Sequence, residues 1–390
     1  MLAEQVTERI LPVAAAPAGS LAPEEAAAEL AARLAAQASA SDQEGGFPVT
    51  EFTWLRAANL LTAPLSEALG GANLHLPLHT LTLLRTLKHI GRGNLAVGRV
   101  YEGHVNALQL MQRYAQPKQV GRWAEDAHAG HLFGVWNTQA NDGVRLEPQA
   151  GGHFRLVGSK TFGSGAGHVT RPLITGALPD GGWQMFILPT DEMPPTLDAS
   201  FWQPLGMRAT ASFRVDLTGL EISTEDLVGQ PGNYYQQPDF SGGAIRFAAV
   251  QLGAAEAVFN ETRRFLQELN RTDDPYQQMR LGELAGLIEG GNLWLRGAAD
   301  HAARATASLD ATATVAYANL VRTAIEDICL RVLQIAERCV GARGLLRPEP
   351  FERLHRDLTH YLRQPAPDAA IADAGRFALA QTEPAHRLWR

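Results

Sequence analysis

Along the first third of the chain, apolar residues recur every three or four positions, which predicts packed amphipathic helices. Loops rich in Gly, Ser, Asp and Pro separate these helical segments. The predicted helices span residues 23–38, 51–61, 78–91, 95–116 and, more briefly, 123–130. The sequence therefore predicts a helical N-terminal domain over residues 1–130.

Near residue 131 the pattern changes to short runs of β-branched and aromatic residues, punctuated by Gly, Pro, Asp and Asn. Such runs predict strands. The predicted strands span residues 132–136, 153–157, 160–164, 171–175, 183–188 and 212–220. Six or more strands at this spacing favour a β-sandwich or small barrel, which we place at residues 131–230.

From residue 243 onward the helical pattern returns, and the segments become long. They span residues 244–269, 275–307, 311–340, 354–363 and 370–382. Long amphipathic helices with few connections favour a four-helix bundle, which we place at residues 231–390. The predicted fold class is α+β, in the order helical domain, β domain, helical bundle.

Composition narrows the class of protein. The 390 residues are 45% hydrophobic and 19% charged, as in globular proteins, and the net charge of −7 argues against a nucleic-acid partner. No apolar run reaches the ~18 residues of a membrane span, and residues 1–16 show no export signal. Cys329 and Cys339 lie about 15 Å apart if one helix carries both, too far for a disulfide. We expect a cytoplasmic protein without a metal site.

The segment 154–167 holds the first candidate chemistry. It predicts a strand, a tight turn at Gly158-Ser159-Lys160 and a second strand, with Lys160 as an exposed edge residue. At a period of two, Phe162 and Ser164 share one face. A flat ring could then stack on the phenyl group and hydrogen-bond to the hydroxyl. The alternative is an ordinary β-hairpin.

Three segments resemble motifs of the acyl-CoA dehydrogenase family of flavoproteins. Residues 158–164, Gly-Ser-Lys-Thr-Phe-Gly-Ser, resemble the family's Gly-x-Lys-x-Trp-Ile-Thr strand. Residues 204–210, Pro-Leu-Gly-Met-Arg-Ala-Thr, resemble its leucine-glycine-arginine segment. Residues 341–344 and 350–357 are similar to its Gly-Gly-x-Gly…Pro-x-Glu-Arg-x-x-Arg-Asp pattern. The resemblance runs from about residue 45 to 380 and implies this fold, with N-terminal helices, a central β domain and a C-terminal four-helix bundle.

The resemblance implies a flavin between the β domain and the bundle. Phe162 stands where an aromatic side chain lies against the isoalloxazine, and Ser164 where a hydroxyl donates near N5. Val135 and Trp136 fall in the strand that lines the same ring, although Trp136 is equally suited to the β-domain core. The family also implies a homo-oligomer, a dimer or tetramer, with residues 244–340 at the interface.

The resemblance implies FAD, but two segments depart from the family pattern. Asp142 replaces a serine that helps to hold the cofactor pyrophosphate, and a carboxylate beside phosphates needs compensation. The segment that serves the partner subunit is shortened to residues 270–278. Arg271 and Gln278 could still reach the adenosine half of FAD, or the loop could simply join two helices. FMN, or an empty site, is therefore the alternative.

The family's catalytic glutamate is missing from both of its usual positions. These correspond to Pro365 and to the neighbourhood of Gly243, and Asp368 is the only nearby carboxylate after Pro365. Dehydrogenation of an acyl thioester needs such a base to take the α-proton. Neither proline nor glycine can transfer a proton.

Residues 359–365, Thr-His-Tyr-Leu-Arg-Gln-Pro, are instead similar to the Thr-His-x-Leu-x-x-Pro of a monooxygenase branch of the same fold. Those enzymes act on sulfur heterocycles or phenols, with reduced flavin supplied by a separate reductase. His360 matches the first histidine of that branch, and Arg363 replaces the second. The alternative for His360 is a helix-end residue bonded to a carbonyl.

We therefore expect a flavin-dependent oxidoreductase. Its substrate would be a small molecule, either an acyl thioester or an aromatic or heterocyclic compound, and an electron-transfer or flavin-reductase partner would serve it. A dehydrogenase with a relocated base and a non-catalytic scaffold are the alternatives. The candidate catalytic residues are His360, Arg363 and Asp368.

Overall fold

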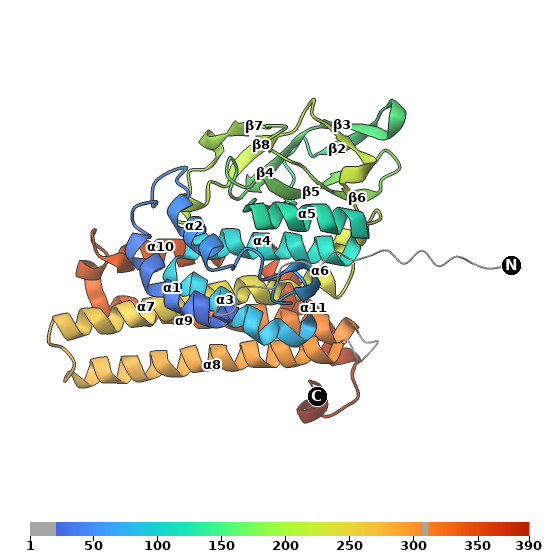
Figure 1. Cartoon of the computed structure of the whole chain (residues 1–390). Helices are drawn as coiled ribbons and strands as arrows, with labels where there is room; N and C mark the ends of the chain where they lie inside the picture. Colours follow the sequence, from blue (N-terminus) through green and yellow to red (C-terminus); the bar gives the residue numbers. More distant parts are fainter. Residues whose placement is uncertain (1–20, 306–310, 390) are drawn as a thin grey trace.

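The computed structural model describes residues 21–305 and 311–389, which form helices, then strands, then helices (Figure 1). This order confirms the predicted fold class. The first helices are α1 Pro23–Gln37, α2 Val49–Ala57, α3 Thr80–Gly93, α4 Leu95–Tyr114 and α5 Pro117–Ala129. The predicted absence of an export signal concerns residues 1–16, which lie outside the described residues.

Local capping explains where the helices beside the sheet begin. The Asn94 side chain accepts hydrogen bonds from the backbone amides of Ala96 and Val97, which fixes the start of α4. Helix α5 begins at Pro117, six residues earlier than predicted, because Gln116 forms a capping box with Gln119.

Ten strands follow in the described part of the chain, in two sheets. They are β1 Phe133–Trp136, β2 Arg145–Pro148, β3 His153–Val157, β4 Ser159–Gly163, β5 Arg171–Ala177, β6 Trp183–Ile187, β7 Thr196–Asp198, β8 Phe213–Asp216, β9 Glu221–Ser223 and β10 Leu227–Val228. The larger sheet has the order β10-β6-β5-β2-β3-β9, with β1 paired in parallel to β5. The smaller sheet has the order β4-β8-β7.

The predicted hairpin around Gly158 is wrong. Strand β3 pairs with β2 and β9, whereas β4 pairs with β8 in the other sheet. Gly158, at φ +107°, lets the chain turn from one sheet to the other without forming a hairpin. Alternation of apolar and polar residues predicts both strands but does not say which strand each one pairs with.

Lys160 was expected to be an exposed edge residue, but its side chain is completely buried. Its Nζ donates to the backbone oxygen of Asn137 at 3.0 Å and to Thr175 Oγ1 at 3.1 Å, and it lies 5.4 Å from the Trp183 ring centroid. Burial lowers the pKa of Lys160 to about 7. The side chain thus bridges the two sheets from the inside.

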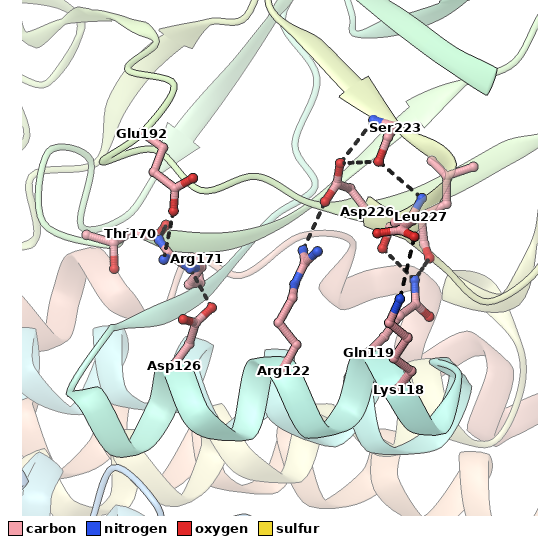
Figure 2. Close-up of polar contacts among 11 residues, drawn as sticks. Lys118, Gln119, Arg122, Asp126, Thr170, Arg171, Glu192, Ser223, Asp226 and Leu227 are labelled. Atoms are coloured by element: carbon pink, nitrogen blue, oxygen red, sulfur yellow. Dashed lines mark hydrogen bonds and ion pairs between the residues drawn. The ribbon is translucent and has the colours of Figure 1, made fainter. Parts of the chain in front are cut away.

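Helix α5 fastens the β domain to the helices below it (Figure 2). Arg122 Nη2 lies 2.9 Å from Asp226 Oδ1, and Arg171 Nε donates to Asp126 Oδ2 at 2.7 Å. Trp123 is fully buried in the same apolar cluster as residues of β1, β5 and β6. Apolar packing flanked by ion pairs therefore fixes the larger sheet on α5.

The remaining helices form the C-terminal bundle. They are α6 Asp239–Gly242, α7 Ala244–Glu268, α8 Pro275–Ala305, α9 Ala311–Gly344, α10 Pro350–Tyr361 and α11 Pro367–Ala380. In Figure 1, α8 forms the outer edge of the bundle, farthest from the sheets. Lys88 of α3 ties the layers together, because its Nζ donates to both Glu256 of α7 and Asn292 of α8 at 2.7 Å.

Two further expectations concern single features of the helices. Cys329 and Cys339 of α9 are both buried free thiols, as their spacing predicts. Helix α10 begins at Pro350, not at residue 354, because proline suits the first turn of a helix. Among the described helices, none combines the length and the apolar character needed to cross a bilayer.

Candidate functional site

A row of aromatic rings connects the β domain to helix α10. The ring centroids of Phe162 and Phe201 are 5.3 Å apart, those of Phe162 and Trp202 6.0 Å, and those of Trp202 and His360 5.4 Å. All three pairs meet edge to face, a favourable geometry for aromatic rings. Phe162 is 48% exposed, whereas Trp202 is buried. The row presents an apolar surface that a flat ring could cover.

A period of two predicts that Phe162 and Ser164 share one strand face, and this prediction is wrong. Phe162 has φ +55°, and β4 ends at Gly163, so Ser164 belongs to the following turn. The Ser164 hydroxyl is 2.9 Å from that of Ser212, which in turn is 2.8 Å from that of Thr210. Ser164 therefore belongs to a chain of hydroxyl groups that holds it in one orientation.

Trp136 and Val135, the candidates on β1, have different surroundings. Trp136 is 1% exposed, and its Nε1 donates to the backbone oxygen of Ser164 at 3.0 Å. It packs in the β-domain core and supports the turn that carries Ser164. Val135 is half-buried, and Gly103 of α4 lies against its backbone.

Asp142 has the compensation that its carboxylate needs. Its Oδ2 accepts from Ser159 Oγ at 3.0 Å and from Arg214 Nη2 at 2.9 Å. Burial alone would raise the pKa of Asp142, but these two donors hold it below its ordinary value. The carboxylate is thus charged and paired with Arg214.

Arg271 and Gln278 stay within their own loop between α7 and α8. Arg271 pairs with Asp274 at 3.2 Å, and Gln278 Nε2 donates to the backbone oxygen of Thr272 at 3.0 Å. No contact joins either side chain to Phe162 or to the rest of the candidate site among the described residues. One chain alone therefore does not bring them to the β domain.

The three candidate catalytic residues are not brought together. Arg363 is exposed and pairs with Glu326 at 3.0 Å, and Asp368 is exposed in the first turn of α11. His360 is half-buried against Trp202, and burial lowers its pKa, so its imidazole is neutral at pH 7. Of the three, only His360 faces the aromatic row.

A buried carboxylate holds α10 in place beside this row. Asp357 Oδ1 accepts from the backbone amide of Met207 at 2.6 Å, and Asp357 Oδ2 lies 3.7 Å from Arg353 Nη1. Burial raises the pKa of Asp357 to about 6. The contact joins α10 to the segment that follows Trp202, and so it helps to set His360 against the indole.

Sequence reasoning missed a polar group inside the molecule, which we call the interior polar cluster. It consists of Arg99 and Glu102 on α4, Tyr234 after the sheets, Arg246 on α7 and Tyr361 at the end of α10. The sequence feature that could have revealed it is the pair Arg99 and Glu102, two charged residues three positions apart on a helix with many buried positions. Because Tyr361 directly follows His360, the cluster adjoins the aromatic row.

Comparisons with known proteins agree with this architecture. Residues 245–364 match the family described as acyl-CoA dehydrogenase, C-terminal domain. A dibenzothiophene monooxygenase of Mycolicibacterium goodii is 24% identical over 413 aligned residues, which cover 93% of this chain and 94% of the relative. Residues 245–364 therefore belong to the acyl-CoA dehydrogenase C-terminal domain family, and the chain as a whole has the acyl-CoA dehydrogenase fold. These relatives are flavin-dependent oxidoreductases, the class that the sequence predicts for this chain.

Solved structures of the acyl-CoA dehydrogenase fold superpose over nearly the whole chain. FMN-bound TdsC of a Paenibacillus species has a TM-score of 0.83 at 20% identity, covering 94% of this chain and all of that one. Methanesulfinate monooxygenase MsuC of Pseudomonas fluorescens has a TM-score of 0.80 at 22% identity, covering 95% of this chain and all of that one. At these identities the likeness shows the fold.

The residues present fit the flavin that the acyl-CoA dehydrogenase family uses. The exposed Phe162 ring offers a stacking surface. The turn beside it carries the Ser164 hydroxyl, which is hydrogen-bonded to that of Ser212. Trp202 Nε1 is buried without a hydrogen-bond partner among the described residues. A ligand carbonyl would satisfy it, and buried donors are rarely left unpaired.

Replacing Ser164 with Ala is expected to weaken flavin retention at least tenfold, or to lower the flavin potential, while the fold persists. A hydrogen bond to a charged group is worth about 1.5–3 kcal/mol. Flavin fluorescence titration and spectroelectrochemistry measure the two effects. Thr161→Ala, which alters a hydroxyl on the same strand that bonds to Gln139 O, is the matched control. Equal flavin affinity and potential in wild type and Ser164→Ala would remove Ser164 from the site.

Proposed function

We propose that the protein is a monooxygenase that uses reduced flavin from a separate reductase to oxidise a small organic molecule. The observation that carries the proposal is the row of rings from Phe162 through Trp202 to His360, which ends in a neutral imidazole and not in a carboxylate. Among the proteins of this fold, a dibenzothiophene monooxygenase and a methanesulfinate monooxygenase support it.

The chain's own residues have three tasks in this reaction. Phe162 and Trp202 hold the flavin ring and keep water away from it. Ser164 would donate a hydrogen bond to the bound ring, and His360, uncharged at neutral pH, would accept a proton from the substrate or hold it in place. Reduced flavin, when bound, supplies two electrons to O2, so that one oxygen atom enters the substrate and the other leaves as water.

We propose that the flavin is FMN. Asp142, paired with Arg214, stands where the resemblance places a pyrophosphate-binding serine, and an ionised carboxylate has no hydrogen to donate to a second phosphate. TdsC, whose structure is FMN-bound, has the same fold. FAD is the alternative if a second subunit brings Arg271 and Gln278 to the adenosine. The mass of the flavin released from purified protein distinguishes the two.

A homo-oligomer is part of this proposal. Helix α8 exposes Tyr276, Met279 and Leu293, which are 69%, 63% and 55% exposed, on the outer edge of the bundle. Exposed apolar side chains along one helix are typical of a subunit interface. Light scattering that gave the mass of a monomer at micromolar concentration would contradict this part.

The decisive assay supplies FMN, NADH, a flavin reductase and O2, and follows a gain of one oxygen atom in candidate substrates by mass spectrometry. We expect His360→Ala to lower the rate at least 100-fold, the usual contribution of a positioned proton acceptor. His355→Ala is the matched control, because this histidine lies on the same helix but bonds to Glu337. Equal rates in His360→Ala and wild type would remove the proposed role of His360.

A further inference from the structure

The interior polar cluster lies between three helices and the sheet edge. Arg99 and Glu102 come from α4, Arg246 from the first turn of α7, and Tyr361 from the last turn of α10. One turn along α4, Gly103 lies against the backbone of β1. The cluster therefore adjoins both the strand proposed to line the flavin and the helix end that carries His360.

The cluster holds more positive than negative charge. Arg99 Nη1 lies 3.0 Å from Glu102 Oε2, and Asn106 Nδ2 donates to the other oxygen of Glu102. That carboxylate is fully engaged. Asp239, whose charge also acts on Arg246, already accepts from the Tyr114 hydroxyl at 2.7 Å and lies 3.4 Å from the guanidinium of Arg113.

Arg246 is left without a counter-charge of its own. Its Nε is buried and has no hydrogen-bond partner, and no acidic side chain forms an ion pair with it among the described residues. A cation in the first turn of a helix is also opposed by the helix dipole. An unpaired buried charge is costly. The described residues thus offer no structural explanation for the position of Arg246.

A second donor in the cluster is also left over. Tyr361 is only 4% exposed, and its hydroxyl has no hydrogen-bond partner among the described residues. It lies within electrostatic reach of Arg99 and Glu102. Arg246 and Tyr361 share Glu102 as an electrostatic neighbour. Because nearly all buried polar groups are paired, two orphaned donors around one carboxylate indicate a ligand. Arg99 keeps 28% of its side-chain surface accessible, so the cluster is not sealed.

Gly243 makes room for the arginine. A Cβ atom on Gly243 would lie 2.6 Å from Arg246 Nη2, closer than atoms can approach. The resemblance to acyl-CoA dehydrogenases places an alternative catalytic glutamate close to Gly243. The guanidinium of Arg246 therefore occupies the space beside Gly243, and a glutamate at position 243 would have to displace it.

We propose that Arg246, together with Arg99 and the Tyr361 hydroxyl, binds an oxyanion of the substrate, so that the substrate is a small organic carboxylate or sulfonate. A guanidinium binds both groups through two parallel hydrogen bonds, and its charge needs the negative partner that a neutral heterocycle lacks. The reaction that follows binding rests on the proposed function, whereas the binding of the oxyanion does not.

Isothermal titration of the purified protein with four probes tests the proposal without turnover. The probes are benzoate, benzenesulfonate and their uncharged counterparts, benzamide and benzenesulfonamide. We expect at least one anion to bind at least tenfold more tightly than its amide, and the tighter anion identifies the head group. Equal affinity for anions and amides would overturn the proposal.

Variants identify the residue responsible. Arg246→Met is expected to weaken binding of the preferred anion at least tenfold, and Arg246→Lys, which keeps the charge, to weaken it less. Arg263→Met is the matched control, because Arg263 is an exposed arginine on the same helix. If Arg246→Met does not fold, Arg246→Lys decides, since loss of the bidentate contact should still lower the affinity. An unchanged affinity in the folded Arg246 variants would overturn the proposal.

Failure of this inference can be told apart from failure of the proposed function. Tight, Arg246-dependent anion binding without oxygenation of any anion would refute the monooxygenase reaction and leave the oxyanion site standing. Oxygenation of neutral heterocycles by a protein that binds no anion would support the reaction and refute the oxyanion site.

Discussion

Replacing Lys160 with Met is expected to change how the stability of the protein depends on pH, by on the order of 4 kcal/mol between pH 7 and 10.5. Burial lowers the pKa of Lys160 from 10.5 to about 7. Between these values the unfolded chain carries a proton on this lysine that the folded chain has lost. Raising the pH therefore stabilises the wild type across that window, and below pH 7 the penalty is constant.

The slope is the signature of a buried lysine that has lost its proton in the folded protein but keeps it in the unfolded chain. One proton bound only in the unfolded state corresponds to about 1.4 kcal/mol per pH unit. In Lys160→Met that contribution disappears, so the difference in unfolding free energy between variant and wild type should change steadily from pH 7 to 10. The lost hydrogen bond to Asn137 O adds a cost of about 1–3 kcal/mol that does not depend on pH.

Urea unfolding at pH 7, 8, 9 and 10 measures this difference. Other groups titrate equally in both proteins, so their contributions cancel when the curves are subtracted. Lys118→Met is the matched control, because the side chain of Lys118 is 89% exposed, and its curve should run parallel to that of the wild type. A parallel curve for Lys160→Met as well would contradict the buried, easily deprotonated lysine.

Lys160 also shows what the sequence could not predict. Alternation along β4 correctly predicts a strand, but the partner of that strand is set by contacts that are distant in sequence. Because β4 pairs with β8 while β3 pairs with β2 and β9, the side chain of Lys160 points between two sheets and not to solvent. Short-range periodicity cannot distinguish these cases.

The fold and the resemblance to the family could be predicted because both depend on short sequence patterns and on the order of these patterns along the chain. Helical periodicity, strand periodicity and three spaced motifs occur in one order, and each of them is local in sequence. Phe162 and His360 were found through those motifs, and the structure connects them through Trp202. Trp202 itself gave no signal, since its role depends on α10 lying beside its loop.

The interior polar cluster was missed for the same reason. Arg246 and Glu102 lie on different helices, and only the packing of α4 against α7 brings their charges together. The sequence shows a charged residue on each helix, which by itself suggests a solvent-exposed face. That Arg246 is half-buried, with an Nε that has no hydrogen-bond partner among the described residues, is a property of the assembled bundle.

Mixed anaerobically with straight-chain acyl-CoA thioesters, the flavin-loaded protein is expected to keep its flavin absorbance. Dehydrogenation needs a proton acceptor within about 3 Å of the α-carbon's proton, and a positioned acceptor contributes roughly 10²–10⁴-fold in rate. Pro365 and Gly243 occupy the two places where the family's glutamate is expected. Asp368 is exposed at the start of α11, where Pro367 restricts the backbone.

Glu102 is the carboxylate that could still overturn this expectation. It is 3% exposed and belongs to the interior polar cluster, but Arg99 and Asn106 engage both of its oxygens, so neither oxygen is free to approach a substrate proton. Stopped-flow spectroscopy settles the matter: bleaching of the flavin band by any acyl-CoA at an enzymatic rate would refute the prediction. Loss of that bleaching in Glu102→Gln but not in Asp368→Asn would then identify Glu102 as the base, and the opposite pattern would identify Asp368.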